Sequence, residues 1–230
     1  TIVFGLAYIV LYPGAGNFAG TLGWTSKGQY NTEIERADAR YNPIFANYAK
    51  QSVEDLAMNA EAVKVGQRLY LNYCAVCHAS TATGGVGFPN LTDDEWLYGG
   101  SANAIKTSIL DGRMGVMPPW EAALGDQGLD EMTQYVLSLS GRQHDAQQAA
   151  AGKAKYDTMC VACHGMDGTG NQALGAPNLT DNNWLYGGSP GVIRQTLAKG
   201  RNGVMPAHRD FLGEDKVHVL AAYIYSLSAK

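Results

Sequence analysis

Residues 70–80 read YLNYCAVCHAS, and residues 156–166 read YDTMCVACHGM. Each stretch contains the pattern Cys-x-x-Cys-His, which falls at Cys74, Cys77 and His78 in the first and at Cys160, Cys163 and His164 in the second. These four cysteines are the only ones among 230 residues, so none is left for a structural disulfide. Two thiols beside an imidazole, used twice in the same order, indicate a dedicated chemical role.

Three chemistries use a Cys-x-x-Cys pair. A zinc ribbon brings two pairs together within about 20 residues, whereas Cys74 and Cys160 are 86 residues apart. A thioredoxin-like dithiol expects a strand–helix–strand setting, which this sequence does not suggest. The third chemistry uses the histidine, since Cys-x-x-Cys-His is the attachment pattern of c-type haem. The pattern therefore predicts two covalently bound c-type haems, with His78 and His164 as iron ligands.

The motifs lie in an internal repeat. The segment VGQRLYLNYCAVCH (65–78) aligns with AGKAKYDTMCVACH (151–164), and PNLTDDEWLYGGS (89–101) aligns with PNLTDNNWLYGGS (177–189). Self-similarity of this length indicates two copies of one structural unit. We expect one domain over 61–140, a polar linker over 141–150 and a second domain over 151–230.

Each copy reads as helical. An apolar stripe at spacings of three and four leads into the first motif, and another closes each copy; the closing stripes are Leu129, Met132, Val136 and Leu139 in the first copy and Val217, Leu220, Ile224 and Leu227 in the second. No alternation typical of a strand is sustained between them. The predicted fold class is all-α, with two tandem domains that each contain long irregular loops.

Haem iron in an electron carrier needs a second axial ligand, and a thioether sulfur raises the potential relative to a second imidazole. The repeat selects Met117 in GVMPPW and Met205 in GVMPAH, because these two methionines align. Met114 aligns with Asn202 and is expected to serve packing. His208, three residues beyond Met205, remains a competing ligand in the second copy.

Paired residues between the motifs and these methionines are candidates for the haem pocket. Trp96 and Trp184 are expected to donate an indole N–H to a propionate, and Arg113 and Arg201 to pair with one. The alternative is that the aromatic residues only fill the core. A backbone carbonyl at Pro89 or Pro177 is expected to orient the imidazole of the iron-binding histidine.

The first twelve residues, TIVFGLAYIVLY, carry no charge. As a helix they would extend only about 18 Å, against about 30 Å for a bilayer core. We interpret 1–12 as the C-terminal part of a transmembrane helix whose start is missing; a buried apolar helix is the alternative. Residues 13–60 are expected to form a connector with short helices. One has a Thr32–Glu35 capping box and ends before Pro43, and another begins at Ser52.

On these residues, each repeat resembles a class I cytochrome c domain. In that fold an N-terminal helix, here with Gly66 and Tyr70 or Gly152 and Tyr156, packs against a C-terminal helix with an aromatic residue, here Tyr135 or Tyr223. The apolar start, the Trp-containing connector and the two domains together resemble the dihaem subunit of cbb3-type cytochrome c oxidases, the CcoP/FixP family. The resemblance covers essentially the whole chain.

The resemblance implies an electron-transfer subunit without a catalytic site of its own. It would relay electrons from a soluble cytochrome c donor to a monohaem cytochrome c subunit and a catalytic haem b/copper subunit that reduces oxygen to water. It would contact membrane lipid in the bacterial inner membrane, with both haem domains in the periplasm. A dihaem carrier of the cytochrome c4 type and a dihaem peroxidase are the alternatives.

Charge gives a further expectation. The chain has 17 basic and 21 acidic residues, so it offers no basic excess for nucleic acid. Residues 61–140 have net charge −5 and residues 151–230 have +2. This contrast predicts that the first domain presents an acidic face to a basic donor.

Overall fold

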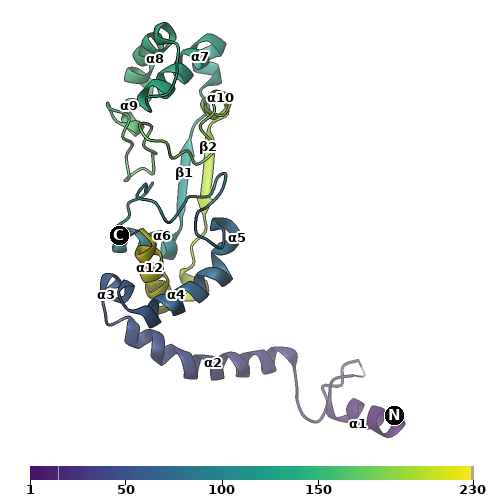
Figure 1. The fold of residues 1–230 in the computed structure, drawn as a ribbon. Helices are drawn as coiled ribbons and strands as arrows, with labels where there is room; N and C mark the ends of the chain where they lie inside the picture. The colour runs from purple at the N-terminus through teal and green to yellow at the C-terminus, as the bar shows by residue number, and fades with distance from the viewer. Residues whose placement is uncertain (15, 229–230) are drawn as a thin grey trace. The chain divides into compact units, whose positions relative to one another are not determined.

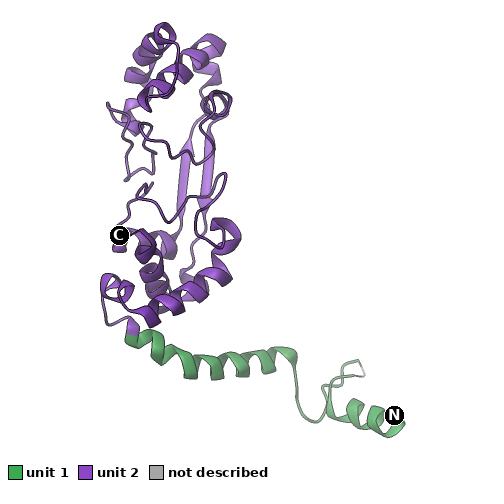
Figure 2. Ribbon diagram, in the orientation of Figure 1, with its two compact units in different colours: residues 1–47 green, residues 48–230 purple. Residues whose placement is uncertain are grey.

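A computed structural model describes residues 1–14 and 16–228, which divide into two compact units, 1–47 and 48–230 (Figure 2). Each unit is described by itself. The first unit contains helix α1 (Ile2–Leu11) and most of helix α2 (Ser26–Tyr48). The second contains all the residues of both haem motifs.

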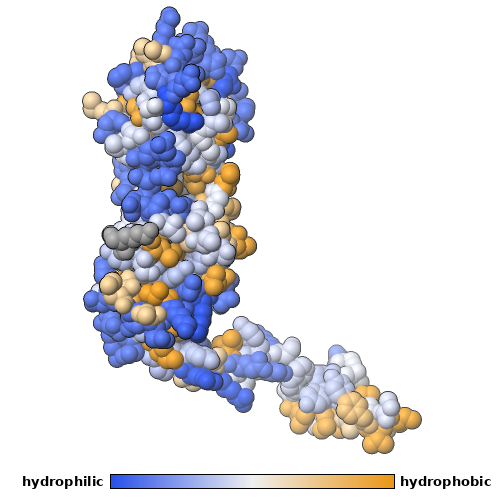
Figure 3. Space-filling model, viewed as in Figure 1, coloured by the Kyte–Doolittle hydropathy of each residue, from blue (hydrophilic) through white to orange (hydrophobic). Residues whose placement is uncertain are grey.

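Helix α1 ends two residues before Pro13, as the sequence predicts. Its apolar side chains are exposed, with Ile2 and Val3 each at 81%, and Figure 3 shows hydrophobic residues gathered along it. After the turn, the backbone N–H of Thr21 donates to Val10 O over 2.9 Å, and Trp24 packs edge-on against Tyr12. Within the described residues, no helix combines the length and the apolar character needed to cross a bilayer.

Helix α2 differs from the prediction at both ends. Thr32 does not cap it: its hydroxyl donates to Gly28 O inside the helix, and Thr25 accepts from Gly28 N at the start. The helix also continues through Pro43 to Tyr48, so the predicted end before Pro43 is wrong. A proline inside a helix loses the hydrogen bond of its own N–H, and its ring crowds the carbonyl four residues earlier; here the helical residues on both sides outweigh that cost. The capping of the next helix by Ser52 is confirmed, since its side chain accepts from Asp55 N.

The second unit is mostly helical (Figure 1). Its elements, in chain order, are α3 (Val53–Ala57), α4 (Ala60–Tyr73), α5 (Ala75–His78), α6 (Ala102–Asp111), β1 (Arg113–Met117), α7 (Glu121–Leu139), α8 (Ala146–Met159), α9 (Val161–His164), α10 (Pro190–Lys199), β2 (Arg201–Met205), α11 (Arg209–Leu212) and α12 (Glu214–Ser228). The closing stripes predicted from periodicity face the interior, with Leu129, Met132, Val217 and Leu220 fully buried.

The two repeats exchange their closing helices. Helix α4 of the first repeat packs against α12 of the second, and α8 of the second packs against α7 of the first. The tyrosine pairs follow the same exchange: the ring centroids of Tyr70 and Tyr223 lie 5.5 Å apart, and those of Tyr135 and Tyr156 lie 5.0 Å apart. Each hydrophobic core therefore combines residues of both repeats.

Glycines allow the exchanged helices to cross closely. A Cβ on Gly66 would lie 2.6 Å from Tyr223 Cβ and 2.7 Å from Val219 O. A Cβ on Gly152 would overlap the carbonyl of Glu131 on α7. Both helix crossings thus depend on a residue without a side chain.

The mostly helical structure agrees with the predicted class, and two short antiparallel strands that were not predicted join the halves. Strand β1 pairs with β2 from Arg113 opposite Met205 to Met117 opposite Arg201, with Gly115 opposite Gly203 at the centre. We call 48–112 with 206–228 the first body, 118–200 the second body, and the two strands the ribbon. Figure 1 shows the ribbon running between the bodies. The strand sequences RMGVM and RNGVM have adjacent apolar residues and a central glycine, so they lack the strict apolar–polar alternation by which a strand is recognised from sequence.

Candidate haem-binding sites

Each Cys-x-x-Cys-His motif forms one short helical turn at the end of a longer helix. Helix α4 ends at Tyr73, Cys74 caps it, and α5 carries Cys77 and His78. Cys77 is exposed and His78 is buried. Helices α8 and α9 repeat this arrangement for the second motif, with Cys163 exposed and His164 buried. In each copy one thiol therefore faces outward while the imidazole points into the body.

A tyrosine of the preceding helix fixes the turn that follows each histidine. The Tyr70 hydroxyl donates to His78 O over 3.1 Å and to Ala79 O over 2.5 Å. The Tyr156 hydroxyl donates to Gly165 O over 2.7 Å. Burial raises the pKa of Tyr70 to about 12, so the hydroxyl remains a donor at neutral pH. These contacts hold the backbone that positions the imidazole.

The two prolines lie where the sequence predicts. The distance from His78 Nδ1 to Pro89 O is 3.0 Å, and that from His164 Nδ1 to Pro177 O is 3.1 Å. A carbonyl can only accept, so Nδ1 carries the proton and Nε2 keeps its lone pair for a metal. Burial lowers the pKa of His164, which favours the neutral imidazole that a metal requires.

The PNLT segments hold these carbonyls in place. Asn90 Oδ1 accepts from the backbone N–H of Thr92 over 3.0 Å and from its hydroxyl over 2.8 Å. Asn178 accepts from Thr180 in the same way, over 2.9 and 2.7 Å. Such a local side-chain bond stabilises a tight turn. Sequence reasoning did not single out the asparagines, although their identity in both copies was a signal.

The more buried cysteine of each motif, Cys74 or Cys160, lacks the lowered thiol pKa that is typical of a redox-active pair. Burial, followed by the charge of the neighbouring thiol, raises the pKa of Cys74 and of Cys160 to about 11. Redox-active Cys-x-x-Cys pairs instead depend on a lowered thiol pKa. The geometry therefore does not favour the thioredoxin-like alternative.

The predicted pocket residues separate into two groups. Trp96 packs against the core that contains Tyr70, with Cys74 beside it. Trp184 packs against the core that contains Tyr156, with Cys160 beside it. The methionines are crossed: Met205 belongs to the first of these cores and Met117 to the second.

The two arginines lie at the roots of the ribbon. Arg113 Nε donates to Ser108 Oγ over 2.8 Å, and Arg201 Nε donates to Thr196 Oγ1 over 2.9 Å. Each guanidinium also lies over a tyrosine ring, Arg113 at 4.7 Å from the Tyr98 centroid and Arg201 at 4.4 Å from that of Tyr186. These tyrosines were missed by sequence reasoning, although the repeated WLYGG contains both.

A buried polar atom near the second motif indicates whether a haem would fit there. Trp184 Nε1 is buried and has no hydrogen-bond partner among the described residues. A buried donor without a partner costs about 1–3 kcal/mol, and an acceptor on a bound group would remove that cost. Cys160 packs against the same core as Trp184, and Cys163 and His164 follow it in the motif. This donor set fits a covalently attached haem with an acidic edge.

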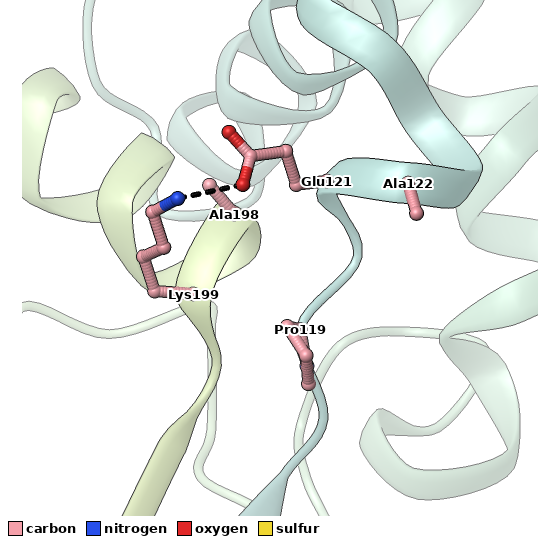
Figure 4. Close-up of a pocket in the computed structure, with 5 residues that line it drawn as sticks. All are labelled: Pro119, Glu121, Ala122, Ala198 and Lys199. Atoms are coloured by element: carbon pink, nitrogen blue, oxygen red, sulfur yellow. Dashed lines mark hydrogen bonds and ion pairs between the residues drawn. The ribbon is translucent and has the colours of Figure 1, made fainter.

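A separate shallow pocket lies where α7 begins beside the end of α10. Its lining is Pro119, Glu121, Ala122, Ala198 and Lys199, and Figure 4 shows Lys199 Nζ reaching Glu121 Oε2, 2.6 Å away. This ion pair joins α7 of the first repeat to α10 of the second. The lining holds no cysteine, histidine or methionine, so we assign it to the exchanged packing.

Two histidines outside the motifs have different surroundings. His218 is buried, and its ring nitrogens lie 3.1 Å from Lys106 Nζ and 2.8 Å from Gln51 O, so both have polar partners. His208 Nδ1 is buried at the start of α11 and has no hydrogen-bond partner within 1–14 and 16–228. His208 thus remains a competitor for Met205.

Comparison with known proteins addresses the family. The family model for cytochrome c oxidase, cbb3-type, subunit III matches residues 61–136 and again residues 147–224. The chain belongs to this family. It is 46% identical over 229 residues to the cbb3-type cytochrome c oxidase subunit CcoP of Rubrivivax gelatinosus, covering 99% of this chain and 75% of that protein. It is also similar to CcoP of Cereibacter sphaeroides (35% identity, 99% and 85% coverage) and to the subunit FixP of Sinorhizobium medicae (36%, 99% and 84%).

Membership confirms the resemblance seen in the sequence. As a cbb3-type subunit III, the chain is a c-type cytochrome subunit of an oxidase, and its two matched domains carry two covalently bound c-type haems. Its partners are other subunits of the oxidase.

Proposed function

We propose that this subunit III relays electrons, one at a time, from a soluble cytochrome c donor to a monohaem cytochrome c subunit and the catalytic haem b/copper subunit. The observation that carries the proposal is the doubled arrangement of a buried imidazole, its carbonyl partner and a methionine in the same core. Histidine–methionine ligation suits an iron that changes oxidation state and keeps its ligands. A peroxidase would instead need an open iron site.

Each residue has a role in this proposal. The thiols of Cys74, Cys77, Cys160 and Cys163 hold the haems as thioethers, and His78, His164, Met117 and Met205 bind the irons. When bound, the haems supply the one-electron chemistry. Trp184 Nε1 and the guanidinium groups of Arg113 and Arg201 are donors for the propionates, with Trp96 as the equivalent of Trp184. Pro89 and Pro177 fix the imidazole tautomer.

The location follows from the same proposal. Haem c is attached outside the bacterial cytoplasmic membrane, so the second unit faces the periplasm. The exposed apolar side chains of α1 support contact of residues 1–12 with the inner membrane as part of a transmembrane helix. Residues 13–60 then connect the membrane to the haem domains.

The net charges of the two bodies support a basic donor, but they do not single out the first repeat as its docking site. The exchange regroups the residues: the first body contains ten acidic and six basic side chains, net −4, and the second contains eight and five, net −3. Both bodies are therefore attractive to a basic cytochrome. Raising the ionic strength should slow electron entry, and rates that stay constant from low to high salt would contradict docking by charge.

The first experiment purifies the chain from detergent-solubilised membranes and records a pyridine haemochrome spectrum. Haem b in fixed stoichiometry with haem c supports the relay, whereas haem c alone at two per chain supports an independent dihaem carrier. The second measures oxygen uptake with reduced soluble cytochrome c. Replacing Cys74 and Cys77 by alanine should abolish uptake from that donor, while a small reductant that reaches the other subunits directly should still support it.

A further inference from the structure

A histidine that belongs to neither Cys-x-x-Cys-His motif follows β2. His208 aligns with Trp120 in the repeat, since GVMPAH (203–208) matches GVMPPW (115–120). Both residues precede a helix with almost the same backbone angles, φ −113° and ψ 2° at Trp120 and φ −116° and ψ 5° at His208. The two backbones are therefore equivalent at this position, and the side chains differ.

Hydrogen bonds hold the backbone of His208 in the first body. Its N–H donates to Ile109 O over 3.0 Å, and its carbonyl accepts from Leu212 N over 2.9 Å. Arg209, the next residue, pairs with Asp111 at the end of α6, with 2.6 Å between Nη2 and Oδ1. The backbone groups of His208 thus have partners inside the protein, and the residue is fixed against α6.

Side-chain packing places this segment beside the first motif. Phe211 packs edge-on against Tyr73, with the ring centroids 5.1 Å apart, and Tyr73 directly precedes Cys74. Leu212 is buried in the core against which Cys74 packs. His208 therefore belongs to the surroundings of the haem held at Cys74 and Cys77.

The imidazole of His208 has an unmet hydrogen-bonding requirement. Two buried side-chain polar atoms have no partner within 1–14 and 16–228, and each body contains one of them, Trp184 Nε1 in the second and His208 Nδ1 in the first. Buried polar groups in folded proteins normally have a partner. An imidazole N–H can donate to a carboxylate, and the carboxylates of a haem are its propionates.

We infer that His208 binds a propionate of the haem held at Cys74 and Cys77, with Nδ1–H as the donor. The inference rests on the proposed function, which attaches a haem there, and it makes His208 a positioning residue and not an iron ligand. His208 then supplies in the first body what Trp184 supplies in the second, from a different point of the repeat. Because a donor disperses the negative charge of the propionate, it favours ferrous iron, and His208 raises the potential of this haem.

The test changes the donor at this position in the full chain within its oxidase complex. His208→Asn keeps an N–H close to the place of Nδ1, His208→Gln moves the N–H toward the place of Nε2, and His208→Phe removes it. Trp184→Phe is the matched variant in the second body. His144→Phe controls for the loss of an exposed histidine.

Two measurements follow the haems. A Cys160→Ala substitution marks the second haem, because one thioether and one remaining vinyl group shift its α band to longer wavelength. Potentiometric titration at the two α bands then gives each potential separately, and Cys163→Ala marks the same haem if Cys160→Ala does not assemble. Resonance Raman spectra of the propionate bending bands report the hydrogen bond directly.

We expect His208→Phe and His208→Gln to lower the potential of the unmarked haem and to shift a propionate band, while His208→Asn changes neither. Trp184→Phe should lower the potential of the marked haem alone, and His144→Phe should lower neither potential. If His208→Phe does not fold, the comparison of asparagine with glutamine decides, because these variants differ mainly in where the N–H lies.

Equal effects in all the His208 variants, or no effect in any of them, would overturn the inference while the relay stands. Conversion of the unmarked haem to high spin by His208→Phe would also overturn it, because His208 would then be an iron ligand. Absence of oxygen uptake from reduced cytochrome c in the native complex would instead contradict the relay, and the Raman spectra would still decide the role of His208.

Discussion

One tyrosine in each approach helix closes the turn that carries the iron-binding histidine. Tyr70 and Tyr156 are almost fully buried. The Tyr156 hydroxyl donates to Gly165 O, and the Tyr70 hydroxyl donates to the carbonyls of His78 and Ala79. The same turn then presents Nδ1 of the histidine to a proline carbonyl. In both copies the position of the histidine therefore depends on hydrogen bonds between neutral groups.

Replacing Tyr156 with phenylalanine should lower the free energy of unfolding by about 1–2 kcal/mol, because the carbonyl of Gly165 would lose its buried donor. Chemical denaturation of the solubilised chain, followed by loss of the haem ligation spectrum, measures the effect. Tyr73→Phe is the matched control, since Tyr73 is 40% exposed. Equal losses in the two variants would contradict a specific role for the Tyr156 hydroxyl.

The sequence predicted those parts of the site whose geometry depends on a few neighbouring residues. Cys-x-x-Cys-His defines its own geometry, and a proline carbonyl beside the imidazole was the expected second partner. Tyr98 and Tyr186 were not expected, because their contacts with Arg113 and Arg201 depend on the path of the ribbon. Contacts between a loop and a strand of the ribbon leave little trace in the spacing of one segment.

At the scale of elements, α7 and α8 are joined by a charged pair. Lys155 Nζ lies 2.5 Å from Glu131 Oε2, and this hydrogen bond, followed by that from Gln127, lowers the pKa of Glu131. A carboxyl pKa that is lower in the folded state contributes stability above its unfolded value, about 4.3. That contribution is lost as the pH falls through the lower folded value.

The free energy of unfolding of the native chain should therefore fall more steeply between pH 5 and about 3 than that of a Glu131→Gln variant. Denaturant midpoints measured across this range give the two slopes. Asp126→Asn is the control, because the Asp126 side chain is 93% exposed and its pair with Arg194 is screened by solvent. Parallel slopes for all three chains would show that Glu131 does not couple to folding.

The close helix crossings give a second prediction. Gly66→Ala should destabilise the second unit by about 1–3 kcal/mol, because the new methyl group meets Tyr223 and the backbone of α12. Gly191→Ala is a matched control, since nothing lies within 4 Å of its Cβ position and α10 is helical there. Thermal unfolding should show a loss for the first and no loss for the second.

Helix periodicity predicted which elements form but not which of them pack together. The stripes at 129–139 and 217–227 have the same spacing, so either one fits either approach helix. The ribbon determines the pairing. Each strand leads the chain out of the body that holds its own haem motif, so the closing helix that follows packs in the other body. The predicted helix end before Pro43 was wrong for a related reason. Proline only disfavours a helix locally, and the helical turns before and after Pro43 keep α2 continuous to Tyr48.

For the whole molecule, exchange makes the two haem bodies a single folding unit. Lys155–Glu131, Arg194–Asp130 and Arg209–Asp111 all join one repeat to the other, as do both hydrophobic cores. The sequence domains 61–140 and 151–230 are units of the repeat, and the bodies of the fold are composed differently. A dihaem chain built this way cannot lose one repeat and keep an intact site in the other.

A protease site placed at 141–145, between α7 and α8, tests this directly. The described residues of this link are mostly exposed, so cleavage there should occur without unfolding. Because α7 of the first fragment packs on α8 of the second, and α12 of the second on α4 of the first, the fragments should co-elute as one species in native size-exclusion chromatography. They should separate only in denaturant, with both haem spectra changing together. Fragments that separate under native conditions, each with an intact ligation spectrum, would mean that each repeat closes on itself.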